Sequence, residues 1–241
     1  MGDNNIYVGR DMEAMAFAVK YHRWILETFR PYLGTRLVEV GAGSGSFSEM
    51  LLDLPFESLS LVEPSGNIYK LLEQRIAGSS RRSNLSTYNG VFRNVASAIS
   101  ADQDPDSIIY VNVLEHIEDD EAELNLIHST LSQRGRAFIF VPAFRWLFGP
   151  FDEKVGHFRR YTRRELENKC RRAGFKIVSS RYFDLIGIVP WWIKYRLLKS
   201  SALELRSVEL YGRYIVPVTK RVEWLVRPPV GKNIILIAEK E

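Results

Sequence analysis

The segment from residue 35 to residue 47 constrains the fold more than any other part of the chain. Leu37 to Val40 is a mostly apolar run with the pattern of a buried β-strand. Three glycines follow it at alternate positions, Gly41, Gly43 and Gly45. Glycine adopts positive φ without strain and lets a ligand approach main-chain N–H groups closely. Because a strand, a glycine turn and a helix form half of a doubly wound nucleotide fold, we expect this turn to hold a small molecule.

The spacing of these glycines disfavours two common nucleotide-binding loops. A dinucleotide fingerprint, Gly-x-Gly-x-x-Gly, requires its third glycine at the position of Ser46. A Walker loop requires a lysine after its glycines, and none follows here. ATP hydrolysis is therefore disfavoured, and an NAD oxidoreductase is retained only as an alternative that Gly45 and Ser46 argue against.

Periodicity of apolar residues alternates between strand-like and helix-like segments along the chain. Strands that alternate with helices indicate a mainly parallel, buried sheet, so we predict an α/β, doubly wound fold. After the proline-rich turn at 228–231, the last strand is suited to an antiparallel return. Helices are expected at 12–32, 46–54, 67–75, 119–131 and 163–173, and the last of these leads into the segment 175–179. Strands are expected at 37–40, 58–62, 85–88, 107–111, 137–141 and 233–238.

The chain is expected to form a single domain over residues 1–241, built from four parts. Residues 1–34 are an N-terminal helical cover, and residues 35–141 are a cofactor-binding core. Residues 142–162 and 184–231 are too long for ordinary connections, and we expect these insertions to form a substrate cap.

Composition excludes several classes of protein. Hydrophobic residues make up 46% and charged residues 26%, which is ordinary for a globular enzyme. The beginning of the sequence lacks the basic and apolar regions of a signal peptide. The lone Cys170 permits no intrachain disulfide, so a reducing, cytoplasmic location is expected. The four histidines and one cysteine are not at paired ligand spacing, so no metal is expected.

Two motifs resemble the class I S-adenosylmethionine-dependent methyltransferases. The segment Glu39-Val-Gly-Ala-Gly-Ser-Gly45 is similar to their motif I. The segment Val-Leu-Glu-His-Ile, with Glu115 and His116, is similar to the small-molecule methyltransferases of the type 11 and 12 group. This resemblance implies a Rossmann-like, seven-stranded sheet and S-adenosylmethionine as the methyl donor. One branch of the group also shares similar segments at 141–143, 156–162, 173–175 and 190–192.

The resemblance implies a cofactor site along the ends of the strands. Glu63 lies 22 residues beyond Gly41, where a doubly wound fold places the carboxylate that accepts the ribose hydroxyls. Asn89 stands where the family often has an acid for the adenine amino group. Tyr21 and Trp24, on the first helix, are expected to cover the methionine end. The full expected set is Glu39, Gly41, Ala42, Gly43, Ser44, Gly45, Phe47, Glu63, Pro64, Asn89, Gly90, Asn112, Val113 and Leu114, with Tyr21 and Trp24.

Two histidines are candidates for a catalytic base. A sulfonium methyl group is already activated, so alignment supplies most of the rate, and a hydroxyl acceptor gains a further factor of roughly 10²–10⁴ from a base. His116 follows the fourth strand, and His157 lies in the long segment after the fifth. The alternative for His116 is that it only hydrogen-bonds the backbone or contacts the cofactor, and the alternative for His157 is that it packs or binds substrate without taking a proton. Asp152 is more simply explained as an ion-pair partner of Arg160 or its neighbour.

The acceptor and partners are less constrained by the sequence. Nucleic acid is disfavoured, because Asn112 is not followed by the Pro-Pro of the base methyltransferases. The segment 186–198 is too short and too charged to span a membrane, and its tryptophans could serve as a lid, a dimer contact or a membrane contact. Monomer and homodimer both remain open. Substrate contacts are expected from Tyr7, Phe144, Trp146, Arg160, Tyr161, Trp191 and Trp192.

Methyl transfer to an oxygen of a metabolite or of a glycan- or lipid-linked substrate is therefore the first expectation. The substrate itself could be acidic or apolar. Transfer to nitrogen is the second expectation. A non-catalytic S-adenosylmethionine-binding protein is the alternative from another class. The acceptor atom depends on the cap rather than on the fold.

Overall fold

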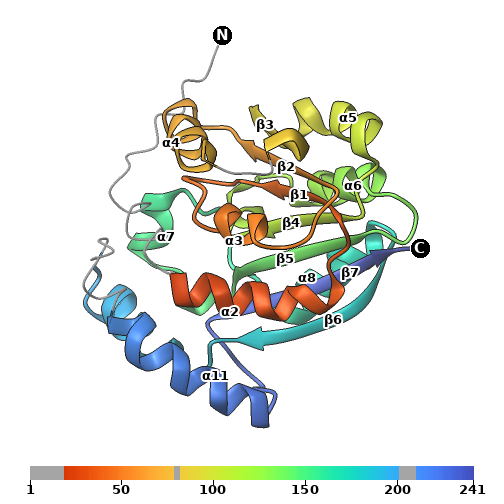
Figure 1. Cartoon of the computed structure of the whole chain (residues 1–241). Coiled ribbons are helices and arrows are strands. Elements are labelled where there is room, and N and C mark those ends of the chain that lie inside the picture. Colours follow the sequence, from red (N-terminus) through yellow and green to blue (C-terminus); the bar gives the residue numbers. More distant parts are fainter. Residues whose placement is uncertain (1–18, 79–81, 201–209) are drawn as a thin grey trace.

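A computed structural model describes residues 19–78, 82–200 and 210–241 of the chain (Figure 1). Seven strands form one sheet in the order β3-β2-β1-β4-β5-β7-β6. Strands β1 to β5 pair in parallel, and β7 runs antiparallel to both β5 and β6. The predicted α/β fold and the antiparallel last strand are thus confirmed. The strands are β1 Arg36–Val40, β2 Ser58–Glu63, β3 Leu85–Asn89, β4 Ser107–Val111, β5 Arg136–Pro142, β6 Phe175–Phe183 and β7 Asn233–Lys240.

Helices cover both faces of this sheet. Side chains from α5, α6 and α8 join one core cluster, and those from α2, α3, α4 and α11 join the other. Successive residues of β1 divide between the clusters, because side chains alternate across a strand: Leu37 enters the second and Val38 the first. The helices are α2 Val19–Phe29, α3 Ser48–Leu52, α4 Gly66–Ile76, α5 Phe92–Gln103, α6 Asp120–Thr130, α7 Pro150–Val155, α8 Arg163–Arg172, α9 Ile188–Trp191 and α11 Val216–Leu225.

The structure adds elements that the periodicity of the sequence did not indicate. Helix α5 fills a segment for which no element was expected, and it buries only Phe92, Ala96 and Ile99. Such a narrow apolar face leaves a weak helical signal in the sequence. Strand β6 extends to Phe183, and its pairing with β7 shifts register between Ile177 and Ser179.

The second insertion forms a helical extension beside the N-terminal helix. Helix α11 lies next to α2, and Lys220 pairs with Glu27 across this contact (Figure 1). Among the described residues, no helix has the length and apolarity required to cross a bilayer. The expected helix at 12–32 is described only from Val19 onward.

Candidate active site

The turn after β1 adopts the conformation that its glycines permit. Gly41, Gly43 and Gly45 have φ values of +71°, +57° and +85°. The N–H groups of Gly41 and Ala42 both donate to the carbonyl of Val62, at 2.8 and 3.0 Å, which ties the turn to the end of β2. At Gly41 even a Cβ atom would lie closer than 3.0 Å to the side chain of Val113. The backbone is thus exposed at a point where side chains of ordinary size do not fit.

Glu63, at the end of β2, is fixed beneath this turn by two main-chain donors. One carboxylate oxygen accepts the N–H of Gly43 and the other that of Ser65, each at 2.8 Å. Burial raises the pKa of Glu63, and these two hydrogen bonds counteract the rise. The carboxylate therefore has a defined orientation and retains free lone pairs for a ligand.

Glu39, within β1, has a different electrostatic character. Its side chain is buried and accepts a hydrogen bond from Ser48 Oγ at 2.6 Å. Burial raises the pKa of Glu39 to about 8, and this hydrogen bond opposes the shift. Near neutral pH the Glu39 carboxyl is therefore mostly protonated and is able to donate a hydrogen bond.

A cavity of about 620 Å³ lies at the carboxyl ends of β1, β2 and β4. This is the edge at which ligands of open α/β sheets bind, and the volume is that of a small-molecule site. The cavity brings together most of the expected cofactor residues and one of the candidate bases: Glu39, Gly41, Ala42, Gly43, Ser44, Phe47, Glu63, Pro64, Gly90, Asn112, Val113 and His116.

The two candidate bases meet although 41 positions separate them in the sequence. The rings of His116 and His157 pack edge to face, with centroids 4.6 Å apart. His157 Nδ1 lies 2.7 Å from Asp152 Oδ1, and its Nε2 lies 3.9 Å from the carboxylate of Glu115. Arg160 binds the same Asp152 through Nε at 2.9 Å and Nη2 at 3.1 Å. Asp152 therefore forms the expected ion pair with Arg160 and, in addition, orients the ring of His157.

The protonation states of these groups differ. Burial, together with the neighbouring His157, lowers the pKa of His116 to about 4, so that its imidazole is neutral at pH 7. Burial raises the pKa of Glu115 to about 7, against the opposing charge of His157. Glu115 is fully buried, and neither of its oxygens accepts a hydrogen bond from another described residue.

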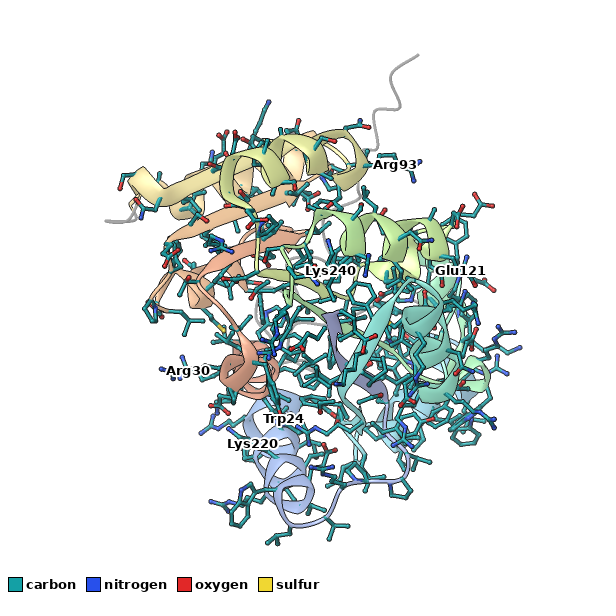
Figure 2. The ribbon with its side chains drawn as sticks, turned by 90° about the vertical axis from the view of Figure 1, so that its right-hand side faces the viewer. Trp24, Arg30, Arg93, Glu121, Lys220 and Lys240 are labelled. Carbon is teal, nitrogen blue, oxygen red and sulfur yellow. The ribbon has the colours of Figure 1, made fainter. Side chains whose placement is uncertain are left out.

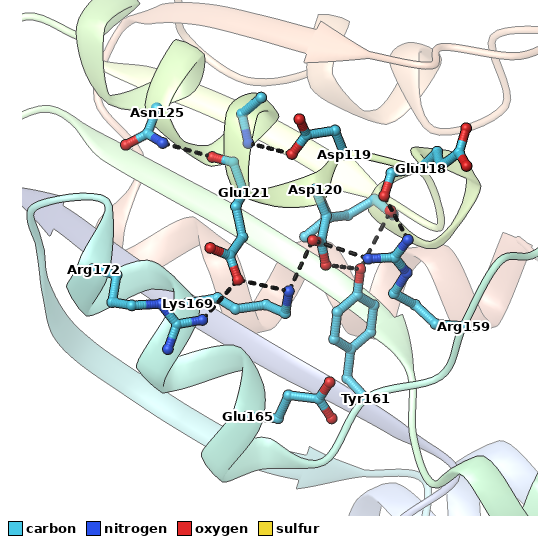
Figure 3. A network of polar contacts seen from close by, with 12 residues as sticks. Glu118, Asp119, Asp120, Glu121, Asn125, Arg159, Tyr161, Glu165, Lys169 and Arg172 are labelled. Carbon is cyan, nitrogen blue, oxygen red and sulfur yellow. Dashed lines mark hydrogen bonds and ion pairs between the residues drawn. The ribbon is translucent and has the colours of Figure 1, made fainter.

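A second polar network fixes the segment that carries His157 (Figure 3). Tyr161 donates to Asp120 at 2.9 Å, and Asp120 also pairs with Arg159 at 3.0 Å and with Lys169 at 2.8 Å. The labelled side chains come from α6 and the two residues before it, from α8, and from the segment between α7 and α8 (Figure 3). This network joins the insertion after β5 to the segment that follows β4, and so holds His157 beside His116.

Comparison with known proteins identifies the family. A family described as a methyltransferase domain matches residues 13–180, which is well over half of the chain. The chain belongs to the methyltransferase-domain family. The expected relation to class I S-adenosylmethionine-dependent methyltransferases, and with it the status of an enzyme, is confirmed.

Solved structures share the fold of this methyltransferase. A SAM-dependent methyltransferase from Archaeoglobus fulgidus superposes with a TM-score of 0.60 at 17% identity, over 93% of this chain and 94% of its own. An S-adenosylmethionine-dependent methyltransferase from Mesorhizobium loti superposes with a TM-score of 0.57 at 15% identity, over 90% of this chain and 98% of its own. At such identities the likeness establishes the fold alone. No curated protein matches the sequence.

Several residues expected at the cofactor do not line the cavity of the methyltransferase. Tyr21 donates to Asp184 at 3.0 Å, and Trp24 stacks on Phe183 with ring centroids 3.8 Å apart. Both belong to the core between α2 and the sheet, and Figure 2 shows Trp24 on α2, on the side of α11. Gly45 and the buried Leu114 lie outside the lining, and Asn89 uses its amide N–H to bind the carbonyl of Glu63 at 2.9 Å.

The cavity also has walls that the sequence reasoning missed. On α2 it is His22 that faces the cavity, within 3.3 Å of Ser46 Oγ, because neighbouring helix positions point about 100° apart. Burial lowers the pKa of His22 to about 4. The lining residues Val91, Phe92 and Arg93 could have been found from the sequence, since they directly follow Gly90 at the same edge of the sheet. The additional lining residues are His22, Ser46, Val62, Ser65, Val91, Phe92, Arg93, Val111, Ile117, Glu123, Val155, Gly156 and Phe158, together with Val40.

Of the residues expected to bind substrate, those that the structure describes do not line the cavity. Phe144 stacks on Trp146 and Tyr182, and the guanidinium of Arg160 lies 4.9 Å from the ring centroid of Trp191. Tyr161 is buried in the network of Figure 3. Trp192 is partly exposed, and Tyr7 lies outside the described residues.

The first insertion reaches the cavity, whereas the described part of the second does not. Val155, Gly156 and Phe158 supply the contact from the first. In the second, α11 leaves Trp224 85% exposed and Leu225 73% exposed. The roles of lid, dimer contact and membrane contact for this insertion stay predictions, as does the division into a core and a cap.

Proposed function

We propose that this methyltransferase transfers the methyl group of S-adenosylmethionine to an oxygen atom of a small-molecule acceptor. The observation that carries the proposal is one cavity with two kinds of wall. A glycine turn and a fixed carboxylate form the first wall, and a cluster of proton-accepting side chains lies at the second.

The first wall fits the cofactor. The carboxylate of Glu63 is oriented by two N–H donors and suits the two hydroxyls of a ribose. The N–H groups of Gly41 and Gly43 already donate to Val62 and Glu63, so it is the main-chain carbonyls of the turn that suit the ammonium group of the amino-acid part. Gly90, with the apolar Val91 and Phe92, supplies a surface for the adenine ring. When bound, the cofactor supplies an activated methyl group on a sulfonium.

The second wall favours an oxygen acceptor. The acceptor oxygen attacks the methyl carbon as the carbon–sulfur bond breaks, and the bonding electron pair remains on sulfur to give S-adenosylhomocysteine. A hydroxyl acceptor must also lose its proton, and His116 at the cavity wall, with Glu115 and His157 beside it, offers side chains that can accept a proton. A neutral amine has no such need before it attacks. Transfer to nitrogen is therefore the second candidate.

Cofactor binding is tested by calorimetry with S-adenosylhomocysteine. We expect saturable binding and a higher melting temperature, since a ligand at 100 times its dissociation constant stabilises the folded state by about 2.7 kcal/mol. Glu63→Gln should weaken binding at least tenfold, because an amide replaces one of the two acceptor oxygens with a donor. Glu49→Gln on α3 is the matched control, because this partly exposed side chain lies outside the cavity lining.

The acceptor is tested by release of S-adenosylhomocysteine from panels of alcohols, phenols, amines and carboxylic acids. Turnover with hydroxyl acceptors supports the proposal, and turnover restricted to amines refutes the choice of oxygen. Binding of the cofactor without turnover on any panel would favour a non-catalytic S-adenosylmethionine-binding protein. Absence of cofactor binding would refute the proposal as a whole.

A further inference from the structure

The cluster beside the cavity has the composition of a metal site. One oxygen of Glu115 and one nitrogen each of His116 and His157 all lie within 4.8 Å of one another. Two imidazoles and one carboxylate form a ligand set that zinc, iron, cobalt and manganese share. The carboxylate comes from the segment after β4, and the second imidazole from the insertion after β5.

The buried carboxylate of Glu115, which has no hydrogen-bond donor on another described residue, is a separate indication of a ligand. A buried carboxylate is normally paired or hydrogen-bonded, because its desolvation is costly. Glu115 is fully buried, and neither oxygen has a hydrogen-bond donor among the other described residues. The nearby imidazole of His157, at 3.9 Å, is beyond hydrogen-bonding distance. A cation between these groups would satisfy the carboxylate.

Both histidines are held in the way that metal ligands are held. A ligating histidine usually gives its other ring nitrogen to a carboxylate or to a backbone carbonyl. Nδ1 of His157 hydrogen-bonds Asp152 Oδ1 at 2.7 Å, and its Nε2 faces the carboxylate of Glu115. The backbone of Gly156 hydrogen-bonds the ring of His116. Arg160 and the N–H of Gly149 in turn fix Asp152.

We propose that Glu115, His116 and His157 bind a divalent transition-metal ion at the edge of the cavity, where the ion holds the acceptor oxygen. Donor atoms that share one such ion lie about 3–3.5 Å apart, so side-chain rotations that shorten the present separations, which reach 4.8 Å, by up to about 1.5 Å would complete the site. His116 lines the cavity, so the open side of the ion faces it. With the ion bound, these three side chains would be ligands rather than proton acceptors. The ion would instead lower the pKa of a bound hydroxyl, whose proton would pass to water. This catalytic part rests on the proposed function; the metal site itself does not.

The test is direct titration of the full chain after removal of any tag and treatment with a chelator. Zn²⁺, Co²⁺ and Mn²⁺ are titrated separately by calorimetry, and Co²⁺ also by its visible absorption, which reports nitrogen and oxygen ligands. We expect one equivalent of Zn²⁺ or Co²⁺ to bind. Glu115→Gln and His157→Asn should each weaken binding at least 100-fold, and Asp152→Asn should weaken it about 10–100-fold.

His128→Asn is the matched control. His128 contacts Phe175, on the face of the sheet that α8 covers, and does not belong to the group of Glu115, His116 and His157. It should bind the metal as the wild type does. Circular dichroism and melting curves verify that each variant is folded, and His116→Asn replaces any variant that is not. No saturable binding of any of the three ions to the wild type would overturn the inference. Undiminished binding in both Glu115→Gln and His157→Asn would also overturn it.

Failure of this inference is distinguishable from failure of the proposed function. Binding of S-adenosylhomocysteine to the metal-free protein is measured in parallel. If that ligand binds and no ion does, the metal site is refuted and cofactor binding stands. If an ion binds and the ligand does not, the metal site stands and the methyl-transfer proposal fails.

Discussion

The close approach of Gly41 to Val113 makes a quantitative prediction for Gly41→Ala. A residue other than glycine in the left-handed region costs about 1–2 kcal/mol. The added Cβ would also lie closer than 3.0 Å to Val113 Cγ2, and overpacking of this kind costs about 1–3 kcal/mol. The two contributions together predict a loss of about 2–5 kcal/mol in the free energy of unfolding.

Gly156→Ala provides the matched control for the backbone contribution. Gly156 has a φ of +80°, and a Cβ there would meet no atom within 4 Å. Its substitution should therefore cost only about 1–2 kcal/mol. Val113→Ala provides the complementary test, because after Cγ2 and Cγ1 are removed the nearest remaining atom, Cβ, lies 3.5 Å away, an ordinary contact.

Urea unfolding of the ligand-free protein measures these differences. The double-mutant cycle of Gly41→Ala with Val113→Ala should show a favourable coupling of about 1–3 kcal/mol, equal to the relieved overpacking. Equal losses for Gly41→Ala and Gly156→Ala, combined with no coupling to Val113, would refute the steric explanation. The cofactor is left out so that lost binding does not contribute.

Three further predictions concern buried polar groups. The Glu39 carboxyl has a pKa of about 8 in the folded state, above its value of 4.5 in the unfolded state. Between these two pH values the folded state holds a proton that the unfolded state has lost. The free energy of unfolding therefore falls as pH rises through this range, by at most about 5 kcal/mol. Glu39→Gln should remove that part of the pH dependence in urea titrations, and an unchanged slope would contradict the assignment. Ser48→Ala removes the hydrogen bond that favours the ionised form, so it should raise the folded pKa further and extend the upper end of the decline to higher pH. Tyr161→Phe should destabilise by about 1–3 kcal/mol because buried Asp120 loses a donor, whereas Tyr182→Phe, with a single 3.4 Å bond, should cost less than about 1 kcal/mol in the same assay.

Much of the fold follows from local patterns. The apolar runs of β4, β5 and β7 are continuous because helices cover both faces of the sheet, so their signal survives in the sequence. Helix α5 escaped prediction because its buried face is narrow. The face of α2 was misassigned for a related reason: periodicity identifies a helix, and packing decides which of Tyr21, His22 and Trp24 faces the cavity.

The sequence by itself determined the glycine turn, the acid at the end of β2 and the order of strands and helices, because these depend on backbone preferences and on periods of a few residues. Only the tertiary structure decided that Asp152 and His157 lie beside Glu115 and His116. Spacing along the chain gave no indication of the proposed metal site, since its candidate ligands come from segments 41 positions apart. Their approach depends on how the insertion after β5 packs onto the segment after β4, through Tyr161 and Asp120. The free energy of such packing is a property of the whole fold, and no short stretch of sequence contains it.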